Sequence, residues 1–378
     1  ETALAMIRFD RRMLAHFDWW LLIMFLLVCA MSLFNLYSAS YPPKPWGTPP
    51  YLKQLYFYLI GFSAILVILA VDYQELHFWN YFFYIFVVGL LAAILIIGKT
   101  AGGAQRWISL GFFNLQPSEL AKLMLVITLA SYYSRKEVTD GYTIRQLVVP
   151  IGLTLVPFVL ILLQPDLGTA LMLGFIFVSM TVFVKLRFSV YAILGSTGVA
   201  MVFLAWEKLL KPYQKQRIQT FLNPEGDPMG SGYQIMQSKI AVGSGGRFGK
   251  GYLEGTQGHL HFLPERHTDF AFAVWSEEWG FFGSLFFISI YFLMLIWGLY
   301  SSAFARDRFG MLLSFGIVML IFWQAVINLL MILGFLPVVG IPLPLVSYGG
   351  SSLLTTLLAF GILLNVRMRR FQVGQNGD

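Results

Sequence analysis

Apolar runs long enough to cross a lipid bilayer recur along the whole chain. A spanning helix needs about 20 apolar residues, and lipid admits only helices or closed barrels because every backbone N–H and C=O must be satisfied internally. Hydrophobic residues make up 57% of the 378 residues and charged residues only 12%. The sequence therefore predicts an all-α polytopic integral membrane protein with about ten transmembrane helices. They fall approximately at residues 19–37, 55–71, 79–98, 117–133, 147–163, 167–184, 189–206, 281–299, 311–334 and 346–366.

Basic residues in the short connecting segments are distributed unevenly between the two sides of the predicted bundle. Thirteen of them gather on one side: Arg8, Arg11, Arg12, Arg135, Lys136, Arg145, Lys185, Arg187, Arg306, Arg308, Arg367, Arg369 and Arg370. Short loops rich in Lys and Arg mark the cytoplasmic side of a membrane protein. We therefore expect both termini to be cytoplasmic and a large extracytoplasmic loop, residues 207–268, between the seventh and eighth helices. The short loops of the outer side carry only Lys44, Lys53, Lys99 and Arg106.

A single membrane domain over residues 1–378 is the expected organisation. The transmembrane bundle would cover about 17–370, and a cytoplasmic tail would cover 371–378. The first span is too long for a signal-peptide core, so we expect it to be retained. The lone Cys29 excludes an internal disulfide and a cysteine-based metal cluster. The basic residues form no stripe typical of nucleic-acid binding.

The large outer loop ends in a polar strip, residues 263–270, that contains Glu265, His267 and Asp269. Apolar sequence follows at once, and a charge drawn toward hydrocarbon is costly unless it is solvated or paired. The strip is therefore a candidate functional site. Two interpretations of Asp269 fit the residues: a cap for the next helix, or a general base whose pKa is raised by partial desolvation.

The remainder of the outer loop is basic and rich in glycine. We expect a basic, turn-rich segment at 211–230, an amphipathic helix at 233–242 and a glycine-rich stretch at 243–258. Together they would form a flexible cationic rim, in which Arg247 and Lys250 could also contact a diphosphate. Neither a Walker A motif nor a dinucleotide fingerprint matches these glycines.

Three basic residues on the predicted outer side are candidate contacts for a diphosphate. Guanidinium and ammonium groups are the usual donors to phosphate oxygens. For each residue, a solvated surface position is the simpler interpretation. The three are Arg106, Arg217 and Lys239.

Glu119 and Lys122 lie three residues apart in the fourth predicted span. This spacing puts both side chains on one helical face, where we expect them to pair. A buried ion pair that only locks helix packing and a pair that faces the substrate are both open, since buried pairs are costly relative to apolar packing. Pro117 suits the first helical turn, which would place the pair about one turn below the outer surface.

Three further residues have a structural and a functional interpretation. Asp166 is expected to cap the sixth span. Trp107, flanked by Gly103, is either an interfacial anchor or part of a loop that covers a ligand. Ser347 opens the last span, where backbone amides of a glycine-rich helix start can hold an anion, although small residues there also allow close helix packing.

Five motifs, in order along nearly the whole chain, resemble those of the SEDS family of bacterial shape, elongation, division and sporulation proteins (RodA, FtsW, SpoVE). Details at Gln237–Ala241, Gly243–Gly246 and Glu265–His267 resemble the RodA type more than the FtsW type. The five motifs are Gly103–Trp107, Gln116–Lys122, Gln164–Thr169, Pro264–Phe270 and Pro342–Gly350.

The resemblance implies a peptidoglycan glycosyltransferase that polymerises lipid II for cell elongation and rod shape. Its place would be the bacterial cytoplasmic (inner) membrane, with the active site facing the periplasm or outside. Its expected partners are a class B penicillin-binding protein (a PBP2-type transpeptidase), other elongasome membrane proteins, lipid II and undecaprenyl diphosphate, and no nucleic acid. No cofactor is required by the motifs, and a divalent cation, Mg²⁺ or Mn²⁺, is left open.

The family's motifs also imply roles for single residues. Asp269 matches the essential aspartate, which would deprotonate the 4-hydroxyl of the acceptor GlcNAc. Glu119 and Lys122 match an important pair in the fourth helix, and Trp107 and Asp166 match functionally sensitive positions. The diphosphate role of Arg106, Arg217 and Lys239 rests only on their charge and on the side of the membrane where they are predicted to lie, not on the resemblance.

Two other classes of function remain open on the sequence. A lipid II flippase would use intramembrane charges to line a path, and it would need charges deep in several helices, often with an inverted repeat. A non-catalytic scaffold for a penicillin-binding protein would tolerate replacement of Asp269 without loss of glycan synthesis.

Overall fold

A helix occupies each of the ten predicted spans in the part of the chain that the structure describes. This computed structural model describes residues 17–41, 47–101, 104–109, 111, 114–136, 138, 140–227, 230–260 and 262–371. Eight helical segments are long and apolar enough to cross a membrane; α7 has only 17 residues, and α5 carries Glu119 and Lys122. The ten helices are α2 (Trp19–Ala39), α3 (Pro50–Ala70), α4 (Gln74–Ile97), α5 (Pro117–Arg135), α6 (Ile144–Leu163), α7 (Leu167–Phe183), α8 (Phe188–Leu204), α12 (Ala271–Ala303), α13 (Arg308–Ile332) and α14 (Gly350–Met368).

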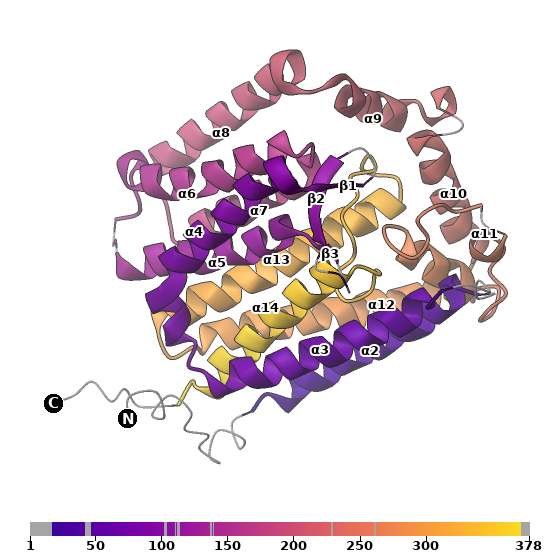
Figure 1. The fold of residues 1–378 in the computed structure, drawn as a ribbon, viewed down its shortest axis with the longest axis horizontal. Coiled ribbons are helices and arrows are strands. Elements are labelled where there is room, and N and C mark those ends of the chain that lie inside the picture. The colour runs from indigo at the N-terminus through magenta and orange to yellow at the C-terminus, as the bar shows by residue number, and fades with distance from the viewer. Residues whose placement is uncertain are drawn as a thin grey trace.

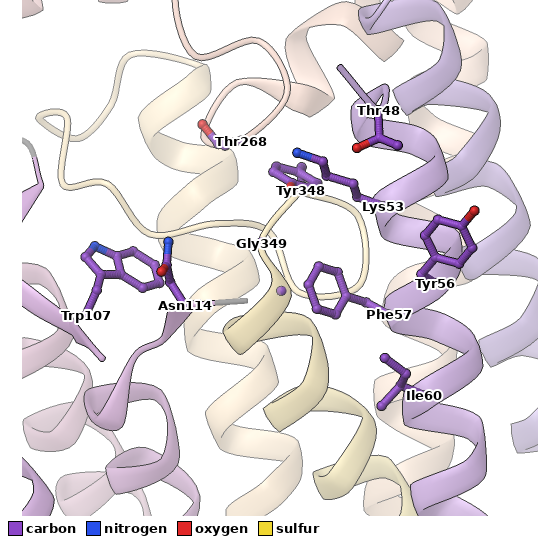
Figure 2. Close-up of a pocket in the computed structure, with 11 residues that line it drawn as sticks. Thr48, Lys53, Tyr56, Phe57, Ile60, Trp107, Asn114, Thr268, Tyr348 and Gly349 are labelled. Carbon is purple, nitrogen blue, oxygen red and sulfur yellow. The ribbon is translucent and has the colours of Figure 1, made fainter. Parts of the chain in front are cut away.

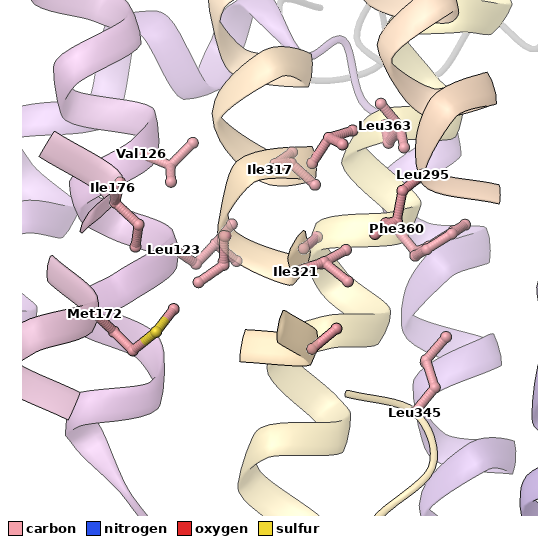
Figure 3. Close-up of a cluster of buried hydrophobic side chains, with 14 of the residues drawn as sticks. Leu123, Val126, Met172, Ile176, Leu295, Ile317, Ile321, Leu345, Phe360 and Leu363 are labelled. Carbon is pink, nitrogen blue, oxygen red and sulfur yellow. The ribbon is translucent and has the colours of Figure 1, made fainter. Parts of the chain in front are cut away.

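The centre of the bundle is formed by α5, α13 and α14 (Figure 1). The helix α14 packs along α3, and α5 packs against α4 and α13. Lipid tails are as apolar as these side chains, so close packing and not exclusion of water holds such helices together. Figure 3 shows buried side chains from α5, α7, α13 and α14 in one cluster, which includes Leu123, Val126, Met172, Ile176, Ile317, Ile321, Phe360 and Leu363.

The first and last helices meet at one end of the bundle. Asp18 caps α2 by accepting a hydrogen bond from the Leu21 backbone N–H at 3.1 Å, and its Oδ2 lies 3.2 Å from Nε of Arg367 at the end of α14. The two described ends of the chain therefore lie together, as an even number of spans requires. Their assignment to the cytoplasm stays a prediction.

The segment between α8 and α12 is more helical than expected. A π-helical segment (Ala205–Leu209) leads into α9 (Pro212–Leu222), a 3₁₀ turn (Pro224–Gly226), α10 (Ser231–Ser244) and the short α11 (Thr256–His259). The helix predicted at 233–242 is confirmed within α10. The prediction of turns throughout 211–230 is wrong, because Pro212 at the first helical position is followed by good helix formers that make α9.

The glycine-rich stretch at 243–258, predicted to be part of a flexible cationic rim, packs against a break in α12. This helix begins at Ala271, not near residue 281, and Gly280 interrupts it with φ of +65°. The freed backbone groups are satisfied from outside the helix. Lys250 N–H donates to the Glu277 carbonyl at 3.0 Å, and Phe281 N–H donates to the Gly246 carbonyl at 2.9 Å.

Side chains add to this attachment. Glu277, fully buried, accepts from Lys250 Nζ at 2.6 Å and from the Thr256 N–H at 2.8 Å. A Cβ on Gly249 would overlap the Glu278 carbonyl, so glycine is required there for contact. Lys250 therefore stabilises the fold, and the glycine-rich stretch supports the start of α12.

A small antiparallel sheet lies between α4 and α5. Its strands are β1 (Lys99–Ala101), β2 (Ala104–Ser109) and β3 (Asn114–Leu115), in the order β1-β2-β3. Trp107 lies in β2, opposite Lys99, so the predicted loop at this position is wrong. Gly103 of the same motif lies outside the described residues.

Candidate functional site

Asp269 lies in the turn that leads into α12, and its backbone is held from another helix. Asn328 of α13 donates from Nδ2 to the Asp269 carbonyl at 2.9 Å and to the Ile341 carbonyl at 2.8 Å. The residue that caps α12 is Phe270, and no side chain makes a capping hydrogen bond. The capping interpretation of Asp269 is therefore wrong, and its carboxyl group is left for another role.

The surroundings of the Asp269 carboxyl make it a stronger base than an ordinary aspartate. Burial is the main cause, followed by the negative charge of Glu265, and together they raise its pKa from 3.8 to about 6 against the opposing positive charge of Arg217. Part of the side chain still reaches the surface. Gly340 leaves space here, since a Cβ added at that position would lie 3.7 Å from Asp269 Oδ2.

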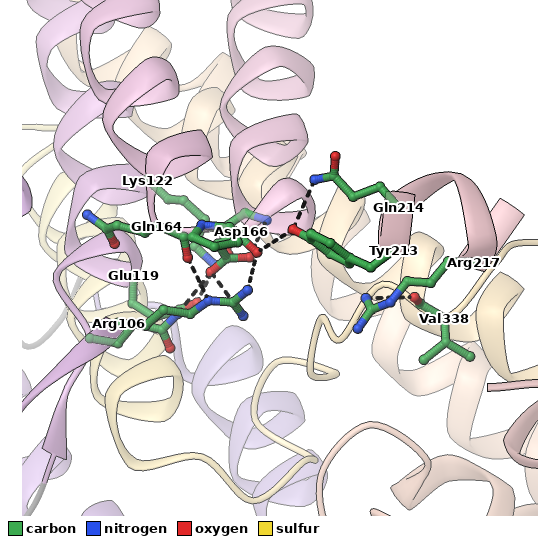
Figure 4. A network of polar contacts seen from close by, with 12 residues as sticks. Arg106, Glu119, Lys122, Gln164, Asp166, Tyr213, Gln214, Arg217 and Val338 are labelled. Carbon is green, nitrogen blue, oxygen red and sulfur yellow. Dashed lines mark hydrogen bonds and ion pairs between the residues drawn. The ribbon is translucent and has the colours of Figure 1, made fainter. Parts of the chain in front are cut away.

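Arg217 reaches this region from α9. Its Nη1 donates to the Val338 carbonyl at 3.2 Å, in the segment that joins α13 to α14, and the residue is exposed. Tyr213, one helical turn earlier, donates to the Pro165 carbonyl at 3.2 Å (Figure 4). The predicted basic residue is thus placed where its charge acts on Asp269.

Arg106 and Asp166 form one polar cluster with the loop before α7. Arg106 donates from Nε to the Gln164 carbonyl at 3.1 Å and from Nη2 to the Pro165 carbonyl. Its Nη1 lies 3.9 Å from Asp166 Oδ2. Asp166 also caps α7 by accepting from the Thr169 N–H at 3.3 Å, so the predicted cap is confirmed.

Glu119 and Lys122 pair as predicted, with 2.8 Å between Oε1 and Nζ. Pro117 occupies the first position of α5, as expected, and both charged residues are buried. Glu119 and Lys122 lie beside the Arg106 and Asp166 cluster in Figure 4.

A cavity of about 610 Å³ lies between the first half of α3, the small sheet and the start of α14. Trp107 lines it, and so does Thr268, the neighbour of Asp269. Figure 2 shows Trp107 and Asn114 on one side of the cavity and residues of α3, including Lys53, on the other. The cavity and the Asp269 turn are thus parts of one region.

Comparison with known proteins identifies the family of this chain. The sequence model of the FtsW, RodA and SpoVE family, described as a cell cycle protein, matches residues 18–372. The chain belongs to this family. It is 38% identical to peptidoglycan glycosyltransferase MrdB of Escherichia coli over 82% of the chain and 84% of that protein. It is 37% identical to stage V sporulation protein E of Bacillus subtilis over 92% of the chain and 96% of that protein.

Solved structures support the same assignment. A chain of a peptidoglycan synthase complex, studied for its coordination of polymerization and crosslinking, superimposes with a TM-score of 0.80 at 33% identity, covering 94% of this chain and 99% of that one. Rod shape determining protein RodA of Thermus thermophilus gives a TM-score of 0.70 at 29% identity, covering 94% and 98%. The protein is therefore an integral membrane member of the family.

Other predicted site residues of this family member hold the turns around Asp269. Ser347 is buried, and its hydroxyl accepts from the Leu343 N–H at 2.9 Å, so its side chain stabilises a turn. The His267 carbonyl accepts from the Tyr348 N–H at 2.8 Å, which joins the strip to the start of α14. Glu265 accepts from the Thr268 hydroxyl at 2.9 Å.

Lys239 lies on α10 with its stem over Gly334, where an added Cβ would overlap it. It is exposed, and its neighbours in the structure are residues at the end of α13, not the Arg106 cluster. Across the described residues, no group of three or more His, Cys, Asp or Glu side chains is arranged to hold a metal ion.

Of the described residues that line the cavity, only Trp107 is a predicted site residue, and those that sequence reasoning missed include Lys53 and Tyr348. Lys53 was counted only as a loop charge, and Tyr348 only as part of a motif. Lys53 follows Pro50 by less than one helical turn, so a helix start with an outward-facing lysine was the available signal.

Proposed function

We propose that the chain is a peptidoglycan glycosyltransferase that polymerises lipid II into glycan strands for cell elongation. Its similarity to the peptidoglycan glycosyltransferase MrdB supports the reaction class. The rod-shape protein of Thermus thermophilus supports the elongation role, while the match to a sporulation protein shows that the family serves more than one process. The relation to a synthase complex supports work beside a class B penicillin-binding protein, with other elongasome proteins nearby.

In the proposed reaction, Asp269 takes the proton from the 4-hydroxyl of the acceptor GlcNAc. The oxygen attacks the anomeric carbon of the growing chain, a glycosidic C–O bond forms with inversion, and the bond from that carbon to the diphosphate oxygen breaks. Undecaprenyl diphosphate leaves with the electron pair. The proton passes from Asp269 to water before the next cycle.

The single observation that carries this proposal is the Asp269 carboxyl itself. A base with a pKa of about 6 is mostly ionised at neutral pH and still takes a proton more readily than an ordinary aspartate. Its partial exposure allows contact with a substrate hydroxyl. Arg217 beside it offers a fixed positive charge where negative charge develops on a leaving diphosphate.

Other polar residues are proposed to hold the elements around Asp269 in place. The Arg106, Asp166 and Gln164 cluster fixes the loop before α7, and the Glu119 and Lys122 pair lies beside it. We assign these residues to positioning the site. The protein is proposed to lie in the cytoplasmic membrane as one domain, with residues 207–268 and the Asp269 site on the outer side.

The distribution of charge favours an enzyme over a flippase. In the described bundle helices, charged side chains lie toward helix ends, and those farthest inside are Lys122 of α5 and the buried Glu277 and Glu278 before the break in α12. A path through the membrane would place charges along the middle of several helices.

The test is polymerisation of labelled lipid II by the purified chain with its penicillin-binding partner in detergent. Asp269→Asn keeps the shape of the side chain and removes the base, so we expect strand formation to fall by at least about 100-fold. Asp140→Asn, in an exposed connection between α5 and α6, is the matched control and should polymerise normally. Normal strand formation by folded Asp269→Asn would refute the assignment, and an inactive wild-type complex would favour transport or scaffolding.

The elongation role needs a cellular test. Expression of the chain should restore rod shape to cells depleted of their elongation polymerase and should not restore division to cells depleted of their division polymerase. The reverse result would assign the chain to division. Parallel assays with chelator, Mg²⁺ or Mn²⁺ decide whether a cation assists.

A further inference from the structure

Lys53 is the one charged side chain among the described residues that line the cavity of about 610 Å³. Figure 2 shows it extending from α3 toward Tyr348. Within the described part of the chain, no hydrogen bond or ion pair engages its ammonium group, and the residue is exposed. An ammonium group in a partly apolar cavity with no acidic neighbour on the wall selects for an anionic ligand.

The rest of the wall suits a sugar. Trp107 and Tyr348 provide aromatic faces, and Thr48, Asn114 and Thr268 provide hydroxyl and amide groups. Sites for small molecules commonly combine apolar and aromatic walls with a few placed polar groups, which orient the ligand. The volume of the cavity is in the usual range for such sites, about 300–1,000 Å³.

The exposed face of α3 continues the cavity with apolar side chains. Tyr56 and Ile60 line the cavity below Lys53, and both are largely exposed. Val67, seven residues after Ile60, extends this exposed face toward the other end of the helix. From Lys53 to Ile60 the helix rises about 10 Å, at 1.5 Å per residue. One helix thus presents a cation at its first turn and an apolar surface beneath, which matches a diphosphate joined to a polyprenyl chain.

Two consecutive residues connect this cavity with the proposed base. Thr268 lines the cavity, and Asp269 responds to the charge of Arg217 on α9. A polymerase that joins two lipid-linked sugars must hold two diphosphates, one on each side of the bond that forms. Lys53 and Arg217 come from different helices and approach the same turn.

We propose that Lys53 binds the diphosphate of one polyprenyl-linked substrate, with its sugar in the cavity and its chain along α3, while Arg217 serves the other diphosphate. This inference rests on the proposed function and adds a second cationic subsite to it. It makes Lys53 a binding residue whose loss weakens one substrate's affinity and leaves Asp269 in place.

The test measures binding without turnover. The full chain in nanodiscs of neutral lipid is titrated with undecaprenyl diphosphate and, separately, with phosphatidylglycerol. We expect Lys53→Gln to weaken undecaprenyl diphosphate binding about tenfold and Lys53→Arg to retain most of it. Tyr56→Ala, an exposed position that can be truncated without opening the core, should also weaken it. Lys208→Gln removes the same charge from an exposed position outside the cavity and serves as the matched control.

The outcomes separate the two proposals. Unchanged undecaprenyl diphosphate binding in Lys53→Gln overturns the inference, and so does equal, Lys53-dependent binding of phosphatidylglycerol, which would make the cavity a phospholipid headgroup site. In polymerisation assays, a higher KM with little change in kcat for Lys53→Gln supports the subsite. A wild-type complex that binds the diphosphate through Lys53 but forms no glycan supports the inference and refutes the proposed function alone.

Discussion

The pH dependence of polymerisation tests the chemistry assigned to Asp269. A base with a pKa of about 6 is roughly one-tenth ionised at pH 5, half ionised at pH 6 and nine-tenths ionised at pH 7. Only the ionised form accepts a proton, so kcat/KM should fall about tenfold from its plateau when the pH drops to 5. The assay is the initial rate of lipid II polymerisation at low substrate concentration between pH 5 and pH 8.

Neighbouring charges provide two variants with opposite expected shifts. Glu265 raises the pKa of Asp269, so Glu265→Gln should move the acidic limb of the profile to lower pH. Arg217 lowers that pKa, so Arg217→Gln should move the limb to higher pH, whatever it does to the height of the plateau. Glu225→Gln changes the same charge at an exposed position of the 3₁₀ turn and should leave the midpoint unchanged. A wild-type midpoint near pH 4, or shifts of both variants in one direction, would refute the reasoning.

Three further predictions concern stability, each measured by thermal unfolding in detergent. Lys122→Met strands the buried Glu119 carboxylate and should cost about 3–5 kcal/mol, so a melting temperature within error of wild type would contradict a buried pair. Gly280→Ala puts a side chain on a residue with a positive φ, and its Cβ would overlap the Gly249 backbone. We therefore expect the melting temperature to fall by several degrees. Asp269→Asn should stabilise the fold by up to about 3 kcal/mol at pH 7.5 and by less at pH 5, because a raised carboxyl pKa makes wild-type stability fall as pH rises from about 4 to 6.

The bounds of a helix could be predicted where the length of an apolar run decides them, and not where contacts with another segment of the chain decide them. The runs that became α2, α6 and α7 begin or end within a few residues of the predicted positions. In α12 the prediction fails, because the glycine-rich stretch satisfies backbone groups around Gly280, so the helix starts at Ala271 and continues through the polar residues before that break. Periodicity within one segment carries no information about such a partner.

The candidate site also contains residues whose contacts could be predicted locally and residues whose contacts could not. Glu119 and Lys122 pair at 2.8 Å because helix geometry alone brings residues three apart together, and Asp166 caps α7 for an equally local reason. Ser347 shows the limit of local reasoning, since its hydroxyl accepts from the Leu343 N–H in a turn before α14, which begins only at Gly350. Lys53 lines the cavity only because α3 lies beside the start of α14, which the sequence around Lys53 does not reveal.

By itself the sequence determined that this is a helical membrane protein with a costly ionisable strip beside its apolar spans, because a bilayer leaves the backbone no other solution. What surrounds Asp269 was decided by tertiary structure alone. Arg217 and Val338 are 121 positions apart and meet only because α9 folds back over the segment after α13. A pKa depends on burial and on charges in space, so the basic strength of Asp269 could not be read from its neighbours in the chain.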